Sequence, residues 1–272
     1  MQANSIRSTA IFNSFRNNIQ NNMQSASQRI ASGRRINSAT DDAAGLGISQ
    51  ALEAQIRGLN QATRNARDFD SALSSADSGL GSISESLIRI RDLSLQASNG
   101  ILNNENRASI QAEIDQHLDH IARVTSDTEF NRINLLDGSF NNMRVQVGAN
   151  SGQSIGMSIQ GTSPAALGIE NFSVMGGPGN INIGAIDSAL NSVVASRGSI
   201  GAMQNRIEHI VDQNNITALN LLAAESRIAD ADIALEMMRL SQSRILQQMQ
   251  TFSIQNQIER TRANVGFVGI MF

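Results

Sequence analysis

Two rows of apolar residues with a spacing of seven run along the stretch from Leu52 to Ala97. The rows lie three residues apart and hold apolar residues at twelve of their fourteen positions: Leu52, Leu59, Ala66, Leu73, Leu80, Leu87, Ser94, and Gln55, Ala62, Phe69, Ala76, Ile83, Ile90, Ala97. This repeat is typical of a helix that packs along its length against other helices. It predicts a long helix of about 69 Å, which needs an equally long partner.

A second pair of rows begins at Val193 and continues to Phe252 without a change of register. Its members are Val193, Ile200, Ile207, Asn214, Leu221, Ile228, Leu235, Gln242, Met249, and Ser196, Met203, Ile210, Thr217, Ala224, Ala231, Met238, Ile245, Phe252. We interpret this stretch as the long partner of the first helix. Asn214, Thr217 and Gln242 are polar residues within the rows, and such residues fix the register of a coiled coil.

The N-terminal segment, residues 1–33, has one apolar stripe with a spacing of 3.6 residues. The stripe consists of Phe12, Phe15, Ile19, Met23, Ala26 and Ile30. It predicts an amphipathic helix that is marginally stable alone. Two interpretations stay open: an arm that frays, or a segment that orders when its stripe meets a partner. The final residues, Val265–Phe272, are apolar again, and an exposed apolar tail needs a cover.

A linker separates the first two predicted helices between Gly33 and Gly47. Gly33 can end the N-terminal helix. Ser38 or Thr40 can cap the next helix, with Asp41 and Asp42 in its first turn, where the helix dipole favours anions. The two aspartates could instead form an acid–base or metal site. We favour capping, because no His, Cys or third carboxylate lies nearby in the sequence.

A shorter helix follows the first long helix after the stop signal Asn99-Gly100. Asn103 or Asn104 can cap it, and the short connection makes it antiparallel to the long helix. Its stripe consists of Ile110, Ile114, Leu118, Ile121 and Val124. His117 and His120 lie three residues apart beside Asp115 and Asp119. They form either a metal site or a solvated polar face, and we favour the polar face.

The period changes from helical to two after Thr128. Met143, Val145 and Val147 alternate with polar residues, as do Ile155, Met157 and Ile159, and residues 148–152 lie between the two runs. This pattern predicts a β-hairpin, with a turn at Asp137-Gly138 before it. Residues 161–180 contain both prolines and are expected to form a loop. Together with the β-hairpin, this loop is expected to form the exposed tip of the molecule.

These elements predict a mainly α fold: an elongated antiparallel bundle of long, coiled-coil-like helices with a small β-hairpin region. The N- and C-terminal helices are expected to pair. Both ends of the chain carry apolar stripes without a globular core of their own. We therefore expect the protein to complete its core by assembling with copies of itself, and contacts between copies that do not close give a helical filament.

Composition argues against several other classes of protein. The net charge of −3 gives no case for nucleic acid or an anionic membrane surface as a partner. The chain has no Cys and three scattered His, and no glycine loop that would hold a phosphate opens a helix, so we expect no enzyme, metal or cofactor. No apolar run is long enough for membrane insertion, and the N-terminus does not have the pattern of a signal peptide.

Several segments closely resemble the signatures of bacterial flagellins. They are Arg35-Ile36-Asn37-Ser38-Ala39, Asp41–Leu46, Leu87–Gly100, Phe130-Asn131, Leu135–Gly138, Ser226–Ile228, Asp230–Asp232 and Ile245–Gln248. The resemblance covers most of the chain, in the order of the family, and fits a short form with little or no variable outer domain. It implies a structural subunit of the extracellular flagellar filament, used for swimming and exported through the flagellar type III channel. It also implies an export chaperone and the filament cap and junction proteins as partners.

The resemblance further implies a division of the chain. Residues 1–40 and 231–272 would be filament-core helices, and residues 41–180 and 181–230 would be the two parts of the rod domain. The implied packing residues of the filament core are Phe12, Phe15, Ile19, Leu235, Met238, Ile245, Met249 and Phe252. The linker motif of the family corresponds to Arg35, Ile36, Asn37, Asp41, Asp42 and Gly45.

Family members that the flagellin-sensing Toll-like receptor recognises use residues that match Arg89, Leu93 and Glu113 here. Arg89 and Leu93 lie one helical turn apart and outside both seam rows, so we expect an exposed Leu beside an Arg. An alternative is that this face packs against the next subunit.

The sequence departs from the family at Arg34, where Leu is usual, at Gly47, where Ala is usual, and in its ending, Arg260–Phe272. Two other interpretations stay open: a hook–filament junction protein of the same axial superfamily, and a non-flagellar coiled-coil scaffold. The junction protein would polymerise little on its own.

Overall fold

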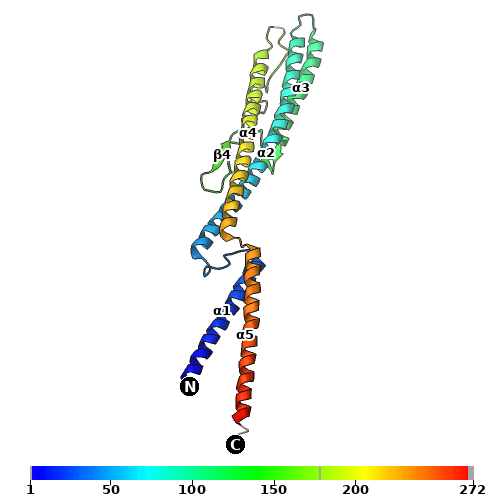
Figure 1. The fold of residues 1–272 in the computed structure, drawn as a ribbon. Coiled ribbons are helices and arrows are strands. Elements are labelled where there is room, and N and C mark those ends of the chain that lie inside the picture. The colour runs from blue at the N-terminus through cyan, green and yellow to red at the C-terminus, as the bar shows by residue number, and fades with distance from the viewer. Residues whose placement is uncertain (1, 178, 269–272) are drawn as a thin grey trace. The chain divides into compact units, whose positions relative to one another are not determined.

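The protein is mainly α-helical (Figure 1), as predicted. The computed structural model describes the backbone of residues 2–177 and 179–268, and the side chains of residues 12–177, 179–256, 258 and 259. The described elements are α1 (Gln2–Ser32), α2 (Ala43–Ala97), α3 (Asn104–Asp127), β1 (Glu129–Phe130), β2 (Ile133–Asn134), β3 (Met143–Gln146), β4 (Ser154–Met157), α4 (Ile183–Ala229) and α5 (Ile233–Val268). The predicted apolar ending, Val265–Phe272, and the atypical stretch Arg260–Phe272 lie outside the described side chains.

The chain forms two compact units. One, the terminal unit, consists of Met1–Ala54 and Asn220–Phe272, and the other, the bundle unit, consists of Gln55–Leu219. Both α2 and α4 contribute residues to each unit. The terminal unit holds the pair of α1 and α5, so the predicted pairing of the terminal helices is confirmed.

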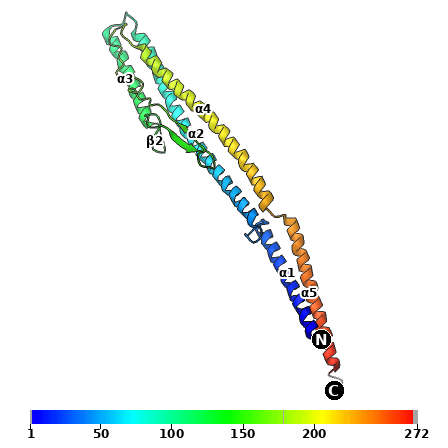
Figure 2. The same cartoon turned by 90° about the vertical axis from the view of Figure 1, so that its left-hand side faces the viewer.

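In the bundle unit, α2, α3 and α4 lie side by side (Figure 2). Ion pairs from Arg91 to Asp187 at 2.7 Å and from Arg197 to Asp77 at 2.8 Å show that α2 and α4 are antiparallel. From Leu59 to Ala97, every member of the two predicted rows of α2 is buried. The seam predicted for the first long helix is therefore confirmed, and it forms the core of this unit.

The predicted start of α3 is also confirmed. The side chain of Asn103 accepts a hydrogen bond from the backbone N–H of Asn106 at 2.8 Å, which makes Asn103 the N-cap. The predicted stripe of α3 faces the core. Arg107 is buried beside it, and its Nε donates to the carbonyl of Ala97 at 3.3 Å. A cation at this position satisfies a free carbonyl at the end of α2 and complements the helix dipole.

Two small antiparallel hairpins accompany the helices. The predicted hairpin is confirmed as β3 and β4, in which Val145 is opposite Ile155. The pairing of β1 with β2 was missed, because it is only two residues long on each side. Its turn consists of Asn131 and Arg132, which both have positive φ, the conformation of a tight type I′ turn.

The β region does not form a tip, contrary to the prediction. It lies along the side of the bundle unit, away from the turn between α2 and α3 (Figure 2). The amide nitrogens of Asn65 on α2 and Asn214 on α4 donate to the carbonyls of Gln146 at 3.2 Å and Val147 at 2.9 Å. The polar position Asn214 of the second heptad therefore holds a strand end, a role that spacing alone did not reveal.

The predicted exposed loop over residues 161–180 also packs against the bundle. It has no helix or strand in its described part, but Ile169 and Val174 are fully buried. The side-chain amide of Gln111 on α3 donates to the carbonyl of Phe172 at 3.1 Å and accepts from the N–H of Val174 at 2.8 Å. One glutamine thus satisfies two backbone groups of the segment, which allows it to cover the core.

The prediction of an uninterrupted second long helix is wrong. The helix breaks between Ala229 and Ile233, where the backbone of residues 229–231 pairs with the linker after α1. Asp232 begins the next helix, because its Oδ1 accepts from the N–H of Leu235 at 3.1 Å. The heptad register continues across the break, which is why spacing alone did not reveal it.

None of the helices in the described part of the chain combines the length and the apolar character that crossing a membrane requires.

Candidate functional site

The two halves of the chain meet where the linker after α1 runs antiparallel to the break between α4 and α5. The N–H of Arg35 donates to the carbonyl of Ala229 at 2.7 Å, and the N–H of Ala231 donates to the carbonyl of Gly33 at 2.9 Å. Gly33 has a φ of +70°, which lets the chain turn away from α1 into this pairing. We call residues 33–42 with residues 225–236 the joint.

The linker motif forms a compact turn within the joint. Asp41 accepts hydrogen bonds from the N–H groups of Asn37 and Ser38 at 3.1 and 3.0 Å, and from the Ser38 hydroxyl at 3.0 Å. The Ser38 hydroxyl first, and then the two N–H groups, hold the pKa of Asp41 below its ordinary value, because each stabilises the carboxylate. Asp41 therefore organises the turn instead of lying inside the first turn of α2.

Asp42 is the N-cap of α2, where the sequence predicted Ser38 or Thr40. Its Oδ1 accepts from the N–H of Gly45 at 2.8 Å, and its carbonyl accepts from the N–H of Leu46. Gly45 is buried, and a Cβ there would lie 2.7 Å from the Cδ1 of buried Ile36. The motif residues thus close the turn around one apolar anchor, Ile36.

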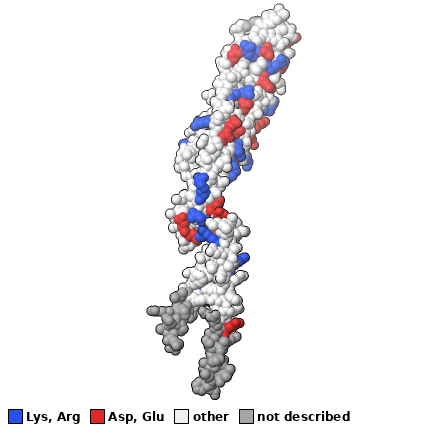
Figure 3. Space-filling view, in the orientation of Figure 1, with Lys and Arg blue, Asp and Glu red and all other residues white. Residues whose placement is uncertain are grey.

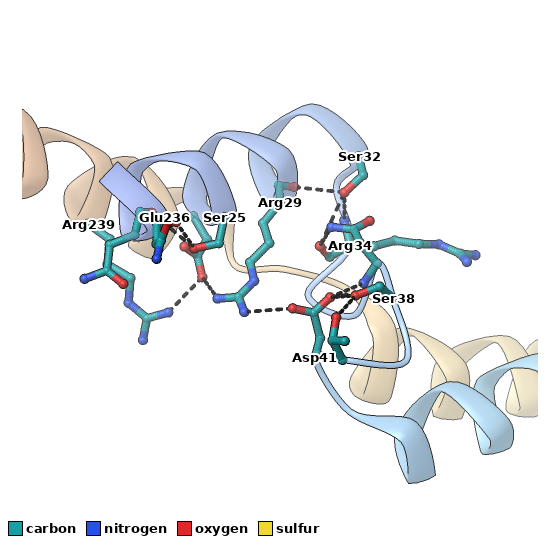
Figure 4. Close-up of polar contacts among 12 residues, drawn as sticks. Ser25, Arg29, Ser32, Arg34, Ser38, Asp41, Glu236 and Arg239 are labelled. Carbon is teal, nitrogen blue, oxygen red and sulfur yellow. Dashed lines mark hydrogen bonds and ion pairs between the residues drawn. The ribbon is translucent and has the colours of Figure 1, made fainter. Parts of the chain in front are cut away.

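Arg29 links this turn to α5 (Figure 4). Its guanidinium lies 3.7 Å from Asp41 and 3.4 Å from Oε1 of Glu236, and Arg239 donates to the same Oε1 at 2.8 Å. Glu236 is only 4% exposed, and its Oε2 is buried without a hydrogen-bond partner. An incompletely satisfied buried carboxylate raises the cost of losing either arginine.

The atypical Arg34 also forms an ion pair in the joint. Its Nη2 lies 3.4 Å from Oε1 of Glu225, which also accepts from the Ser49 hydroxyl at 3.1 Å. Glu225 is buried, so Arg34 supplies a counter-charge that the usual Leu would not supply.

The faces of the terminal helix pair are the reverse of those in the bundle unit. The buried residues of α5 are polar and lie seven apart: Glu236, Ser243 and Gln250. The predicted rows point away from α1, and their members in α5 are between 40% and 66% exposed: Leu235, Met238, Ile245, Met249 and Phe252. The expectation that these rows are buried against the first long helix is therefore wrong for α5.

The apolar stripe of α1 is only partly buried in the contact with α5. Ile19 and Ala26 are buried, Phe12 is partly buried, and Phe15 is half exposed. The amide of Gln250 donates to the carbonyl of Phe12 at 3.3 Å, and Arg29 contacts Glu236, so α1 and α5 run antiparallel.

The uncovered face of α5 carries little charge. Met237, Met238, Ser241, Gln242, Ile245 and Leu246 line an open groove on it. On the side seen in Figure 3, charged side chains are frequent on the bundle unit and sparse on the described part of the terminal helices. A weakly charged apolar face on a helix is suited to cover by another protein surface.

Arg89 and Glu113 are brought together as an ion pair across α2 and α3. The Arg89 Nε donates to Oε1 of Glu113 at 3.0 Å, and about half of each side chain is exposed. Leu93 is 1% exposed, so the expectation of an exposed Leu is wrong. The bundle has a third helix, α3, and α2 therefore buries a wider face than its two rows.

The histidines of α3 do not form a ligand cluster. His117 is partly buried and His120 is exposed, while Asp115 accepts from the amide of Gln111 at 2.7 Å. In the described ranges, 2–177 and 179–268, no group of three or more His, Asp and Glu residues could hold a metal ion.

Sequence reasoning missed Arg29, Glu236 and Gln111. Neither Arg29 nor Glu236 lies in the apolar stripe of its helix, so the spacing of apolar residues gave no signal for them. No local pattern distinguishes Gln111 from the other glutamines of the chain.

Comparison with known proteins identifies both halves of the chain. Residues 4–141 match the model of the bacterial flagellin N-terminal helical region, and residues 183–265 match that of the C-terminal helical region. The chain is 40% identical to a flagellin of Halalkalibacterium halodurans over 84% of its length and 85% of that protein. It is 39% identical to the flagellar filament 33 kDa core protein of Treponema phagedenis, over 86% of each chain.

The fold is also similar to that of a solved protein at low sequence identity. A putative flagellar hook-associated protein from Vibrio parahaemolyticus superposes with a TM-score of 0.59 and 18% identity, over 70% of this chain and all of that one.

Proposed function

The chain belongs to the bacterial flagellin family, and from this we infer that it is a structural subunit of the bacterial flagellar filament. The subunit is exported by the flagellar type III route, polymerises outside the cell and serves swimming motility. The family is structural, which agrees with a chain built from helix seams.

The observation that carries assembly in this chain is the outward apolar face of α5. Five large apolar side chains that a coiled-coil seam would bury are exposed, while Glu236, Ser243 and Gln250 fill the contact with α1. Full burial of each apolar side chain stabilises by about 1.5–3 kcal/mol. Neighbouring copies that cover this face thus supply the missing stabilisation, and an open helical array lets every copy do so.

Electron microscopy of the purified protein under polymerising salt conditions tests this function. Long tubes are expected from the unmodified chain, whereas a hook–filament junction protein or a non-flagellar scaffold would form none. Phe252→Glu places a charge on the α5 face without a loss of buried contacts, so we expect a folded monomer that does not polymerise. Ile101→Glu is the matched control, since Ile101, in the turn after α2, is the most exposed large apolar residue among the described side chains. It should form tubes.

We propose the filament-core roles of Phe12, Phe15, Ile19, Leu235, Met238, Ile245, Met249 and Phe252 on the same basis. The exposed members contact neighbouring copies, and buried Ile19 holds α1 on α5. Cross-linking in the filament through cysteines introduced at Phe15 and Met249 tests this, since the natural chain has no Cys. Cross-links between different copies support the roles, and cross-links only within one copy contradict them.

We also propose the finer division of the chain, with filament-core segments 1–40 and 231–272 and rod segments 41–180 and 181–230. The break after Ala229 and the turn of the linker support these boundaries. Hydrogen exchange of the filament against the monomer tests them: the two core segments should gain the most protection.

An export chaperone and the cap and junction proteins are the further partners that we propose. The groove with Met237 and Leu246 supports a chaperone that covers α5 before assembly. Leu246→Glu should weaken co-purification with the chaperone, and Ile101→Glu should not.

We propose, finally, that the surface around Arg89 and Glu113 binds the flagellin-sensing Toll-like receptor. The exposed ion pair supports this role, and Leu93, one turn further along α2, is buried in the core. In a receptor reporter assay with monomers, Arg89→Ala and Glu113→Ala should lower the response. Arg91→Ala is the control, because Arg91 makes a similar exposed pair with Asp187 at another place on α2.

A further inference from the structure

Three exposed thioethers lie close together on the uncovered face of α5. The protein has ten Met and no Cys, so thioethers are its only sulfur groups. Met237, Met238 and Met249 are each more than half exposed, and all three lie on α5 within thirteen residues. Met157 is buried in the bundle unit, and Met175 is exposed there, outside the α5 face.

These three methionines are exposed to oxidants and must also stay apolar for assembly. Exposure makes a thioether accessible to oxidants, while contact with a neighbouring copy requires that the side chain stay apolar. Met237 and Met238 line the groove with Ile245 and Leu246, and Met249 continues the same exposed row. The surface that must be dry after assembly is therefore chemically reactive before it.

We propose that Met237, Met238 and Met249 form an oxidant-sensitive site through which peroxides block assembly of the free subunit. This inference rests on the proposed function. A sulfur lone pair attacks the terminal oxygen of the oxidant, an S–O bond forms and the O–O bond of the peroxide breaks. Methionine is oxidised by two electrons to the sulfoxide, and the peroxide is reduced to water.

The sulfoxide opposes assembly because it is a strong hydrogen-bond acceptor on a face that neighbouring copies must desolvate. In the groove, Ser241 and Gln242 lie near Met237 and Met238 and can donate to a sulfoxide. Met249 lies outside the residues that line this groove. We therefore assign the largest effect to oxidation of Met249.

Assembly should reverse this sensitivity. In the filament the same thioethers are covered by neighbouring copies, so the oxidant reaches them slowly. The subunit is then vulnerable only until it joins the filament, and existing filaments persist under oxidant while their growth stops.

Growth from unoxidised filament seeds measures the effect. Purified subunits are treated with hydrogen peroxide, the sites are mapped by the gain of about 16 Da per peptide, and the lowest subunit concentration that supports growth is determined. We expect this concentration to rise about tenfold or more for oxidised subunits, since burying an unsatisfied polar group costs at least that factor. In preformed filaments the same peptides should be oxidised several-fold more slowly.

Leucine variants separate the site from general damage. The triple variant Met237→Leu, Met238→Leu, Met249→Leu keeps similar apolar volume, so it should polymerise and stay competent after peroxide treatment. Met175→Leu is the matched control and should remain sensitive. If the triple variant polymerises poorly even without oxidant, Met249→Leu alone serves instead and should retain most of the resistance.

Two results would overturn the inference alone: equal growth of oxidised and untreated subunits, or equal sensitivity of the leucine variants and the wild type. A different result, no tubes from untreated subunits at any concentration, would overturn the proposed function and this inference with it.

Discussion

The bundle unit and the terminal unit use the same seven-residue apolar spacing in opposite ways. In α2 the rows point inward, and every member from Leu59 to Ala97 is buried. In α5 the rows point outward, and Glu236, Ser243 and Gln250 occupy the inner face. An apolar stripe therefore indicates that a helix will be buried against another surface, while the partner that buries it depends on the rest of the structure.

This difference also separates stability from assembly. The apolar seam makes the bundle unit stable in a single chain, whereas the polar seam leaves the terminal helices with most of their apolar surface for neighbouring copies. Mutations in the two units should therefore have opposite profiles: those in the bundle should unfold the monomer, and those on the outer face of α5 should leave it folded and prevent polymerisation.

The largest effect on the monomer is expected in the bundle seam. Leu87 is fully buried, and Leu87→Ala should lower the free energy of unfolding by about 2–5 kcal/mol through lost contacts and a cavity. Met238→Ala removes an equally regular member of the heptad from α5, yet it should change the monomer by less than about 0.5 kcal/mol. Urea unfolding followed by circular dichroism measures both, and equal losses would contradict the comparison.

A local effect should follow loss of the Arg29 contact. Arg29→Ala leaves buried Glu236 with Arg239 as its remaining ionic partner, so the pairing of α1 with α5 should weaken by about 1–3 kcal/mol. Amide hydrogen exchange should report this loss in α1 and α5 and not in α3. For comparison, Arg91→Ala breaks an exposed pair in the bundle unit and should cost about 0–1 kcal/mol. If both variants lose a similar free energy, burial of Glu236 does not increase the cost of losing its ionic partner.

A smaller effect of opposite sign is expected from the polar seam itself. Ser243→Ala removes a buried hydroxyl and improves helix propensity, so it should stabilise the terminal pair by about 0.5–1 kcal/mol. Ser192→Ala makes the same exchange at an exposed position of α4 and isolates the propensity, about 0.5 kcal/mol or less. Amide hydrogen exchange measures the effect of the first variant in α5 and of the second variant in α4. If Ser243→Ala raises protection by no more than Ser192→Ala does, burial of the Ser243 hydroxyl costs no free energy.

The smallest effect concerns pH. The pKa of Asp41 is lowered by the Ser38 hydroxyl and by the N–H groups of Asn37 and Ser38. Since the folded pKa lies below the unfolded one, the stabilisation is present above about pH 4 and is lost as pH falls through the folded pKa. The amides of Asn37 and Ser38 should lose protection only in that acidic range, and in Asp41→Asn this pH dependence should disappear.

Asp137 provides the counterpart in the bundle unit. Its pKa is lowered by hydrogen bonds from Ser139, so Asp137→Asn should remove acid sensitivity there and leave the linker unchanged. Loss of the linker's pH dependence in this variant would show that the two turns are coupled.

Local patterns predicted the elements whose causes are local. Asn103 as a cap, the α2 rows and the β3–β4 alternation all depend on neighbours within a few residues or on one repeating face. They could be read directly from the order of residue types.

The errors in burial and in the bounds of the long helices arise where a distant segment supplies the partner. Leu93 is buried because α3 lies against α2, and residues 172–174 are held because Gln111 satisfies two of their backbone groups. The break before Ile233 exists because the linker after α1 pairs with residues 229–231. The family motif marks the linker, but resemblance alone did not reveal Arg29 and Glu236 as its link to α5.

The pairing of Arg35 with the end of α4 has a consequence for the order of folding. The Arg35 guanidinium donates to the carbonyl of Ile228, 193 residues away in the chain. Closing a flexible loop of that size costs about 5 kcal/mol in chain entropy, and prior folding of the intervening residues lowers this cost. Pulsed hydrogen exchange should therefore detect protected amides in α3 before those in α1. A chain whose C-terminal half is not yet free to fold lacks the carbonyl of Ile228, so the joint cannot form before that half is available.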